Sequence, residues 1–324
     1  MAVPSSPPSM TDAAAQGSSR RALLSAMRSS LASYWTEAEP YQRFAYVVGA
    51  LLVASGAFHV LVYAIDGGSW AGPISWRKPI LFGFSFGISL ITLGWFMTFL
   101  PRRRRVGWAL MGLFGVAAVL EVGLITMQRW RGVASHFNET TGFNGAVFSL
   151  MGTMVFVVGV VVVALTAWSL TSLTAPPSMA LAIRLGLVLL VVSQLLGVMI
   201  IVNGVGVVDP AAAGSRTPSI WGAAGVMKLP HALTLHAVQV LPVLAWLASF
   251  TRWSEDRRVR VVRLAAVGYV GLALLSTYQT FSGLAPFDLS LLTLALIGLS
   301  VAAIALSYAT ALAGLRQGVR HPAS

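Results

Sequence analysis

Eight long apolar runs, separated by short polar stretches, make up most of this sequence. Each run has about 20 residues, the length that an α-helix needs to cross a hydrocarbon core of about 30 Å. Only 10 % of the 324 residues are charged, whereas soluble domains carry about 25 %. These features exclude a water-soluble fold. They predict an all-α, polytopic bundle of about eight transmembrane helices in a lipid bilayer, because a helix satisfies its own backbone hydrogen bonds in lipid.

The runs divide the chain into three parts, with the spans in the middle. Residues 1–42 are expected to form a disordered tail, rich in Pro, Ser and Ala over 1–18, and a short amphipathic helix over 19–36. The tail lacks the central apolar stretch of a signal peptide. Residues 43–316 form the transmembrane domain, and 317–324 a short tail. We expect spans at about 44–65, 79–100, 107–128, 144–169, 180–203, 230–251, 264–284 and 288–315.

The basic residues predict how the spans are oriented. Lys and Arg beside the spans are retained preferentially in the cytoplasm. With eight spans, sixteen of the 22 Lys and Arg fall on the side that holds both termini, and six fall on the other. Both termini are therefore expected in the cytoplasm.

The remaining composition excludes several kinds of chemistry. The chain has no cysteine, which rules out disulfides, iron–sulfur clusters, thiolate zinc sites and cysteine nucleophiles. Its net charge of +12 comes from short basic runs between the spans, so we expect membrane topology rather than nucleic-acid binding to explain it. No Gly-x-Ser-x-Gly elbow and no phosphate-binding loop occurs.

Ionisable residues within the spans are the first candidates for a functional site. A charged side chain near the bilayer centre costs about 2.5–3.5 kcal/mol, so such residues normally face partners or a wet cavity. Glu121 is the only acidic residue well inside a predicted span, and His59 and His236 fall at a similar depth on two other spans. We expect His59, Glu121 and His236 to bind a divalent metal, Zn²⁺ or Fe²⁺. His136 or His231 would contribute from above, and Gln239 lies one turn below His236.

The loops on the extracytoplasmic side carry the candidate substrate-binding residues. Arg77 and Lys78 lie at the mouth of the second span. The next loop is dense in hydrogen-bonding groups, which suits a cap over a site. The third loop, from Asn203 through Asp209 to Lys228, is rich in glycine and is read equally as a lid or a flexible connector. The cations are expected to hold a carboxylate, and the full binding set is Arg77, Lys78, Gln128, Arg129, Arg131 and Asn138.

Three motifs resemble a known group of proteins. Trp-Arg-Lys-Pro at 76–79, Arg-Gly-x-x-Ser-His-Phe-Asn at 131–138 and His-Ala-x-Gln-x-Leu-Pro at 236–242 are similar to motifs in uncharacterised bacterial, actinobacterial-type, multi-pass membrane proteins. More faintly, the chain resembles the membrane protein of valanimycin-type pathways, which is implicated in joining two nitrogens. The resemblance implies a bacterial cytoplasmic membrane and a role in natural-product biosynthesis.

Three functions remain in competition on sequence grounds. The first is a metal-dependent membrane enzyme acting on a small polar or anionic substrate, for instance by rearranging a hydroxylamine derivative. The second is a b-type haem protein for electron transfer, with His59 and His236 as axial ligands. The third is a proton-coupled permease for small solutes with Glu121 as proton carrier. Assistance by a soluble partner is left open.

Overall fold

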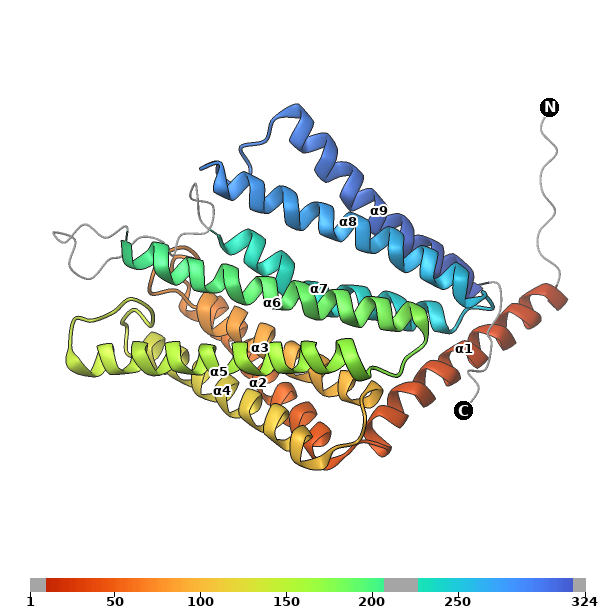
Figure 1. The fold of residues 1–324 in the computed structure, drawn as a ribbon, viewed down its shortest axis with the longest axis horizontal. Coiled ribbons are helices and arrows are strands. Elements are labelled where there is room, and N and C mark those ends of the chain that lie inside the picture. Colours follow the sequence, from red (N-terminus) through yellow and green to blue (C-terminus); the bar gives the residue numbers. More distant parts are fainter. Residues whose placement is uncertain (1–9, 207–226, 317–324) are drawn as a thin grey trace.

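The computed structural model describes residues 10–206 and 227–316. Over these ranges the chain forms α-helices and no strands, with one short 3-10 turn at Met97–Phe99 (Figure 1). The helices are α1 (Met10–Thr36), α2 (Pro40–Asp66), α3 (Arg77–Phe96), α4 (Arg104–Trp130), α5 (Gly142–Ser172), α6 (Pro177–Gly206), α7 (Lys228–Ser249), α8 (Glu255–Phe281) and α9 (Leu291–Arg316).

Helices α2 to α9 are the eight described helices that are long and apolar enough to cross a membrane. The predicted multi-pass helical fold is therefore confirmed. An even number of spans returns the chain to the side from which it started, so the beginning of α2 and the end of α9 lie on one side.

The break between the last two spans depends on a glycine. Gly283 adopts a φ of 71°, a left-handed conformation that glycine reaches without steric cost. Its N–H donates to the carbonyl of Thr280 (3.1 Å), and the next N–H donates to the carbonyl of Gln279 (3.1 Å). This pair of bonds is a Schellman motif, which ends a helix by satisfying its last carbonyls. It explains why α8 and α9 are separate helices.

Two helices begin nine residues earlier than the sequence predicts. Helix α1 starts at Met10 rather than at residue 19, so the predicted disordered tail over 1–18 is wrong from Met10 onward. The early start is explained by Ala13–Ala15, because alanine has the highest helix propensity of all residue types. Helix α8 starts at Glu255 rather than at 264. Its first turn holds two acidic residues, which stabilise the start of a helix by interacting with the positive end of its dipole. Residues 1–9 and 317–324, and the predicted lid from 207 to 226, lie outside the described residues.

The spans pack as two groups of four. Within α2–α5, α2 packs mainly on α3 and α4 on α5; within α6–α9, α6 packs on α7 and α8 on α9. The groups meet where α5 contacts α6 and where α3 contacts α7. We call the α3–α7 contact the seam. The tyrosine hydroxyls of Tyr269 and Tyr308 tie α8 and α9 to α7, donating to the carbonyls of Leu233 (2.8 Å) and Val240 (2.6 Å).

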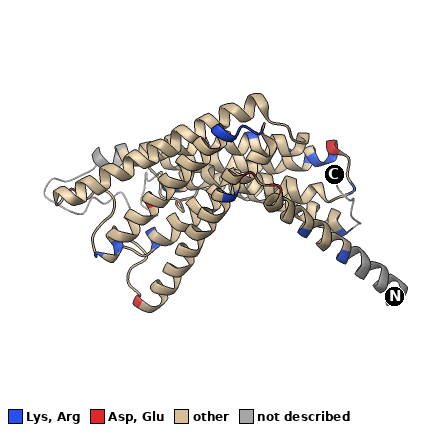
Figure 2. Ribbon diagram, turned by 90° about the horizontal axis from the view of Figure 1, so that it is seen from below, with Lys and Arg blue, Asp and Glu red and all other residues tan. Residues whose placement is uncertain are grey.

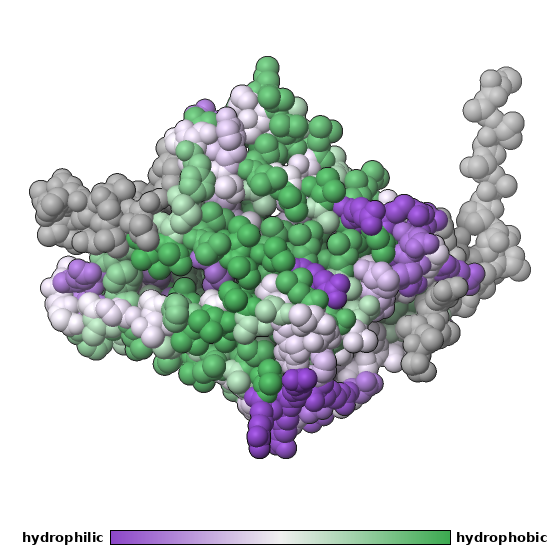
Figure 3. All heavy atoms as spheres, in the orientation of Figure 1, coloured by the Kyte–Doolittle hydropathy of each residue, from purple (hydrophilic) through white to green (hydrophobic). Residues whose placement is uncertain are grey.

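The surface fits a bilayer. Hydrophobic side chains cover most of the middle of the face seen in Figure 3, and hydrophilic groups gather at its right and lower ends. Lys and Arg occur in short stretches, mostly near helix ends (Figure 2). Burial of the spans in lipid thus follows from the distribution of side chains as well as from helix length.

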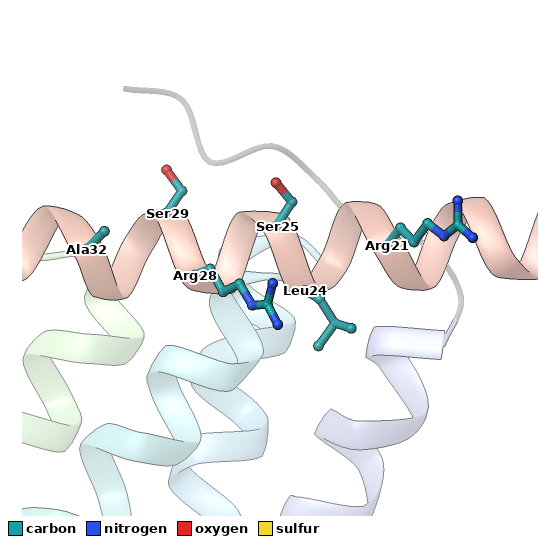
Figure 4. A pocket seen from close by; sticks show the side chains of 6 residues that line it. All are labelled: Arg21, Leu24, Ser25, Arg28, Ser29 and Ala32. Atoms are coloured by element: carbon teal, nitrogen blue, oxygen red, sulfur yellow. The ribbon is translucent and has the colours of Figure 1, made fainter.

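Helix α1 lies at the end of the bundle that is opposite the loop after α4 (Figure 1). Ala26 is buried against Phe250 and Leu315, and Trp246 Nε1 donates to Ser30 Oγ (3.2 Å). In the close view of Figure 4, Leu24 and Arg28 point toward the ends of the spans, whereas Ser25 and Ser29 point away. The helix is therefore docked on the bundle by one face.

The predicted orientation can be tested by cysteine labelling, since the natural chain has no cysteine to give a background. Glu139 and Arg103 are exposed and lie in loops at opposite ends of the spans. We expect a membrane-impermeant maleimide to label Glu139→Cys in intact spheroplasts. Arg103→Cys should react only after permeabilisation. The reverse pattern would mean that both termini are extracytoplasmic.

Candidate functional site

Polar side chains gather at the end of the bundle opposite α1. Helices α3 and α7 begin here, α4 ends here, and residues 131–141 connect α4 to α5 (left side of Figure 1). The four elements supply a carboxyl group, an imidazole and lysines. We describe them from the most buried group outward.

Glu121 and His136 approach each other at the centre of the site. Glu121 lies on α4 and is only 2 % exposed. His136 Nε2 lies 3.9 Å from Glu121 Oε1. Glu121 Oε2 is buried and has no hydrogen-bond partner among the described residues, which is costly for a polar atom removed from water. The structure therefore brings together two of the residues that the sequence predicts for the site.

A chain of hydrogen bonds links His136 to Lys78. Lys78 Nζ contacts Ser135 Oγ at 3.5 Å, and this oxygen lies 2.9 Å from His136 Nδ1. An ammonium group can only donate, so Ser135 accepts from Lys78. The second lone pair of the same oxygen accepts from Nδ1–H in one neutral tautomer of the ring, and that tautomer leaves Nε2, which faces Glu121, free to take up a proton. These residues form a chain, Lys78–Ser135–His136–Glu121, which we call the relay.

The loop after α4 folds inward and holds His136 in the relay. Asn138 Nδ2 donates to the carbonyl of Ala134 (2.8 Å), and Asn138 Oδ1 accepts from the backbone N–H (3.2 Å) and the hydroxyl (2.7 Å) of Thr140. Phe137 has a φ of 55°, uncommon for a residue with a side chain. The His136 ring packs against Phe82 and Phe148, with centroids 5.6 and 6.4 Å away. A tight turn and an aromatic wall thus place the imidazole over Glu121.

The surroundings of His136 favour its neutral form. Burial, followed by the positive charges of Lys78 and Lys228, holds the pKa of the His136 imidazole well below its usual range. Neutral imidazole can accept a proton from a substrate, the form that a general base requires.

This lowered pKa predicts that acid destabilises the protein. The unfolded chain binds a proton at His136 near pH 6.5, whereas the folded chain does so only at much lower pH. Stability should therefore fall as pH drops below about 6.5, by at most about 1.4 kcal/mol per pH unit. We expect the thermal midpoint of the wild type to drop more between pH 7 and 5 than that of His136→Gln. Parallel curves would contradict this account.

His59 has a structural environment. It is 3 % exposed, and its Nδ1 lies 2.7 Å from the carbonyl oxygen of Ser55, to which it must donate. Its Nε2 accepts from Trp130 Nε1 (3.2 Å). Trp76 stacks beside the same ring, with centroids 5.8 Å apart. Both ring nitrogens are thus engaged, and His59 joins the end of α2 to the end of α4.

Replacing His59 should lower stability without affecting metal content. His59→Leu removes both hydrogen bonds and leaves the Trp130 N–H unpaired, at a cost of about 1–3 kcal/mol. Trp130→Phe, which removes only the donor, should lower the thermal midpoint less. Elemental analysis of the purified variants should give the wild-type value. Selective loss of a stoichiometric metal in His59→Leu would instead identify this residue as a ligand.

His231 and His236 contact different partners, as their five-residue spacing predicts. His231 Nδ1 lies 2.8 Å from the carbonyl oxygen of Ser193 on α6. His236 Nδ1 lies 3.2 Å from Gln239 Oε1, and Gln239 Nε2 donates to Ser89 Oγ on α3 (3.4 Å). His231 thus joins α6 to α7, whereas His236 and Gln239 lie along the seam.

The predicted metal ligands are not gathered into one group. In residues 10–206 and 227–316, no three His, Cys, Asp or Glu side chains form a group that could hold a metal ion. Glu121 faces His136, whereas His59 and His236 have the partners described above. A divalent metal, and haem as its alternative, stay predictions.

Most of the predicted substrate-binding residues hold the loop in place. Arg129 pairs with Asp66 (3.2 Å) and lies 3.8 Å above the Trp76 ring. Asn138 closes the turn described above. The buried Gln128 donates through Nε2 to Asn144 Oδ1 (3.2 Å), and Arg131 Nη1 donates to the same oxygen (3.1 Å). Lys78, in the relay, and the buried Arg77 lie at the start of α3.

Sequence reasoning missed three contributors to the site. In the sequence, Lys228 was used only as one of the basic residues that predict membrane orientation. Phe82 and Phe148 are two of many aromatic residues in apolar runs. The position of Lys228, three residues before His231 at the start of a span, was the available signal. No comparable signal marks the two phenylalanines.

Comparisons with protein-family models, curated proteins and solved structures give no match to this chain. The resemblance to bacterial multi-pass membrane proteins therefore stays a prediction.

Proposed function

We propose that this chain is an integral membrane enzyme that catalyses proton transfer on a small anionic substrate, reached from the extracytoplasmic side. The observation that carries the proposal is the approach of His136 Nε2 to Glu121 Oε1, 3.9 Å apart in a buried site. A buried carboxyl and a neutral imidazole in contact are a typical pair for general acid–base catalysis. Hydrogen bonds of such pairs are often long before substrate binds.

The relay gives each residue a role in this proposal. His136 takes up a proton from the substrate at Nε2, Glu121 exchanges a proton with the substrate through its unpaired oxygen, and Ser135 holds the imidazole in one tautomer. Lys78 holds the anionic group. Rearrangement of a hydroxylamine derivative, which the sequence resemblance implies, is one reaction of this class.

A proton-coupled permease is the second candidate, and one observation favours it. The contacts of Gln239 with Ser89 and His236 continue the polar groups along the seam. A solute moving between the two helix groups would meet these side chains after the relay.

Comparing metabolites tests both candidates. Cells that produce the wild type, Glu121→Gln or His136→Gln at equal membrane levels are analysed by mass spectrometry, medium and cytoplasm separately. Glu139→Gln, on the exposed part of the same loop, is the matched control. An enzyme depletes one compound and yields another of different structure, whereas a permease moves one compound unchanged. Conversion that persists in both relay variants would refute the enzyme proposal.

One sample of the purified protein is enough to test the metal and haem predictions. Zinc or iron at one equivalent that is lost in Glu121→Gln and His136→Gln would extend the proposal to metal-assisted chemistry. A Soret band would support the haem alternative.

A further inference from the structure

A second lysine lies beside the relay, on the other half of the bundle. Lys228 opens α7, a helix that contacts α3. The contact of Gln239 with Ser89 lies eleven residues after Lys228 on α7 and eleven residues after Lys78 on α3. Lys78 is in the second position of α3. The two lysines therefore belong to different helix groups and lie at the same level at the extracytoplasmic end of the seam, where both positive charges act on His136.

Within residues 10–206 and 227–316, these cations have no acidic partner. Neither ammonium lies within 4.0 Å of a carboxylate oxygen of the described residues. Repulsion from Arg77 and Lys78 also acts on Lys228. Like charges that approach one another at a partly buried position raise the free energy of the folded state. An anion between them would offset this cost.

The side chains, rather than the helix backbone, are the groups available to bind. At the start of α3, the N–H of Arg77 donates to Ser75 Oγ (3.2 Å) and that of Lys78 to the carbonyl of Ser75 (3.2 Å). Lys78 donates one ammonium proton to Ser135 and has two more protons to donate. Lys228 makes no hydrogen bond to a described residue through its side chain.

We propose that Lys78 and Lys228 form a binding site for a small oxyanion, a carboxylate or a phosphate, that bridges the two helix groups. The inference rests on the proposed function and deepens it, because it names the anionic group of the substrate. Glu121, on the far side of His136, has an unpaired oxygen that would accept a hydrogen bond from the remainder of the molecule. The site therefore binds one end of the substrate as an anion and leaves the other to the relay.

Thermal unfolding of the purified full-length protein tests this inference. The probes are sodium acetate, sodium phosphate and sodium chloride at equal ionic strength. We expect acetate or phosphate, but not chloride, to raise the thermal midpoint with a saturable dependence on concentration. The better of the two probes distinguishes a carboxylate from a phosphate ligand.

Lysine variants test whether Lys78 and Lys228 cause the stabilisation by the oxyanion. Lys78→Met and Lys228→Met should each weaken the effect of the oxyanion by about 10- to 100-fold, the range for a lost hydrogen bond to a charged group. Without the anion, Lys228→Met should be at least as stable as the wild type, because it removes one repulsive charge and no hydrogen bond to a described residue. Arg103→Met, an exposed cation at the other end, should keep the full response.

The outcomes separate this inference from the proposed function. Equal stabilisation by all three salts, or stabilisation that survives in both lysine variants, would overturn the oxyanion site even if conversion still depends on Glu121 and His136. A lysine-dependent oxyanion effect without such conversion would retain the site and reject the enzyme.

Discussion

Gly87→Leu should prevent α2 and α3 from packing and destabilise the protein by about 3 kcal/mol or more, at the upper end of the cost of overpacking. A Cβ atom at Gly87 would lie 2.6 Å from the carbonyl oxygen of Gly49 and 2.9 Å from the backbone nitrogen of Val53. These atoms belong to helix backbone and cannot move aside. Small residues allow such close approach of helices in membranes.

A second glycine provides a matched control. At Gly159 on α5, an added Cβ meets no atom within 4 Å, so Gly159→Leu makes the same change in open space. Both variants are compared with the wild type by fluorescence-detected size exclusion and by thermal midpoint in detergent. We expect Gly159→Leu to give a monodisperse peak and Gly87→Leu to aggregate. Equal behaviour would show that α2 and α3 do not need this close contact.

The spans were predictable because lipid restricts the choices. A long apolar segment must be helical to satisfy its backbone, so hydropathy located α2 to α9 without knowledge of their contacts. The starts of α1 and α8 were less predictable. Both extend into polar sequence, where helix propensity and charges near the helix dipole decide the boundary.

The site was predictable in composition but not in pairing. Burial cost marked Glu121, and the density of polar groups marked the loop that contains His136. Their contact depends on a turn through Phe137 and Asn138, and the conformation of this turn does not follow from the residue pattern. His59 is a related case, since the sequence marked this imidazole by its depth alone and its partner Trp130 lies 71 residues away.

Lys228 shows why charge patterns near membranes are ambiguous. A lysine at the end of a span serves equally as a topology signal and as a binding group. Only the approach of α7 to α3 distinguishes the two, and helix packing across the seam is not readable from one sequence.

Glu121→Gln should lower the turnover of the purified enzyme by about 10²- to 10⁴-fold, the usual contribution of general acid–base catalysis. Glutamine keeps the size of the side chain but cannot exchange a proton. His136→Gln should cause a loss of similar size, since it removes the other half of the pair. Turnover is measured on the compound that the metabolite comparison identifies.

The double variant distinguishes a joint mechanism from two separate contributions. If Glu121 and His136 act as one unit, removing both should cost no more than the worse single change, because the second residue has no function without the first. Glu139→Gln removes a carboxylate from the exposed part of the loop and should keep wild-type turnover. Losses that multiply in the double variant would mean that the two side chains work independently, despite the 3.9 Å between them.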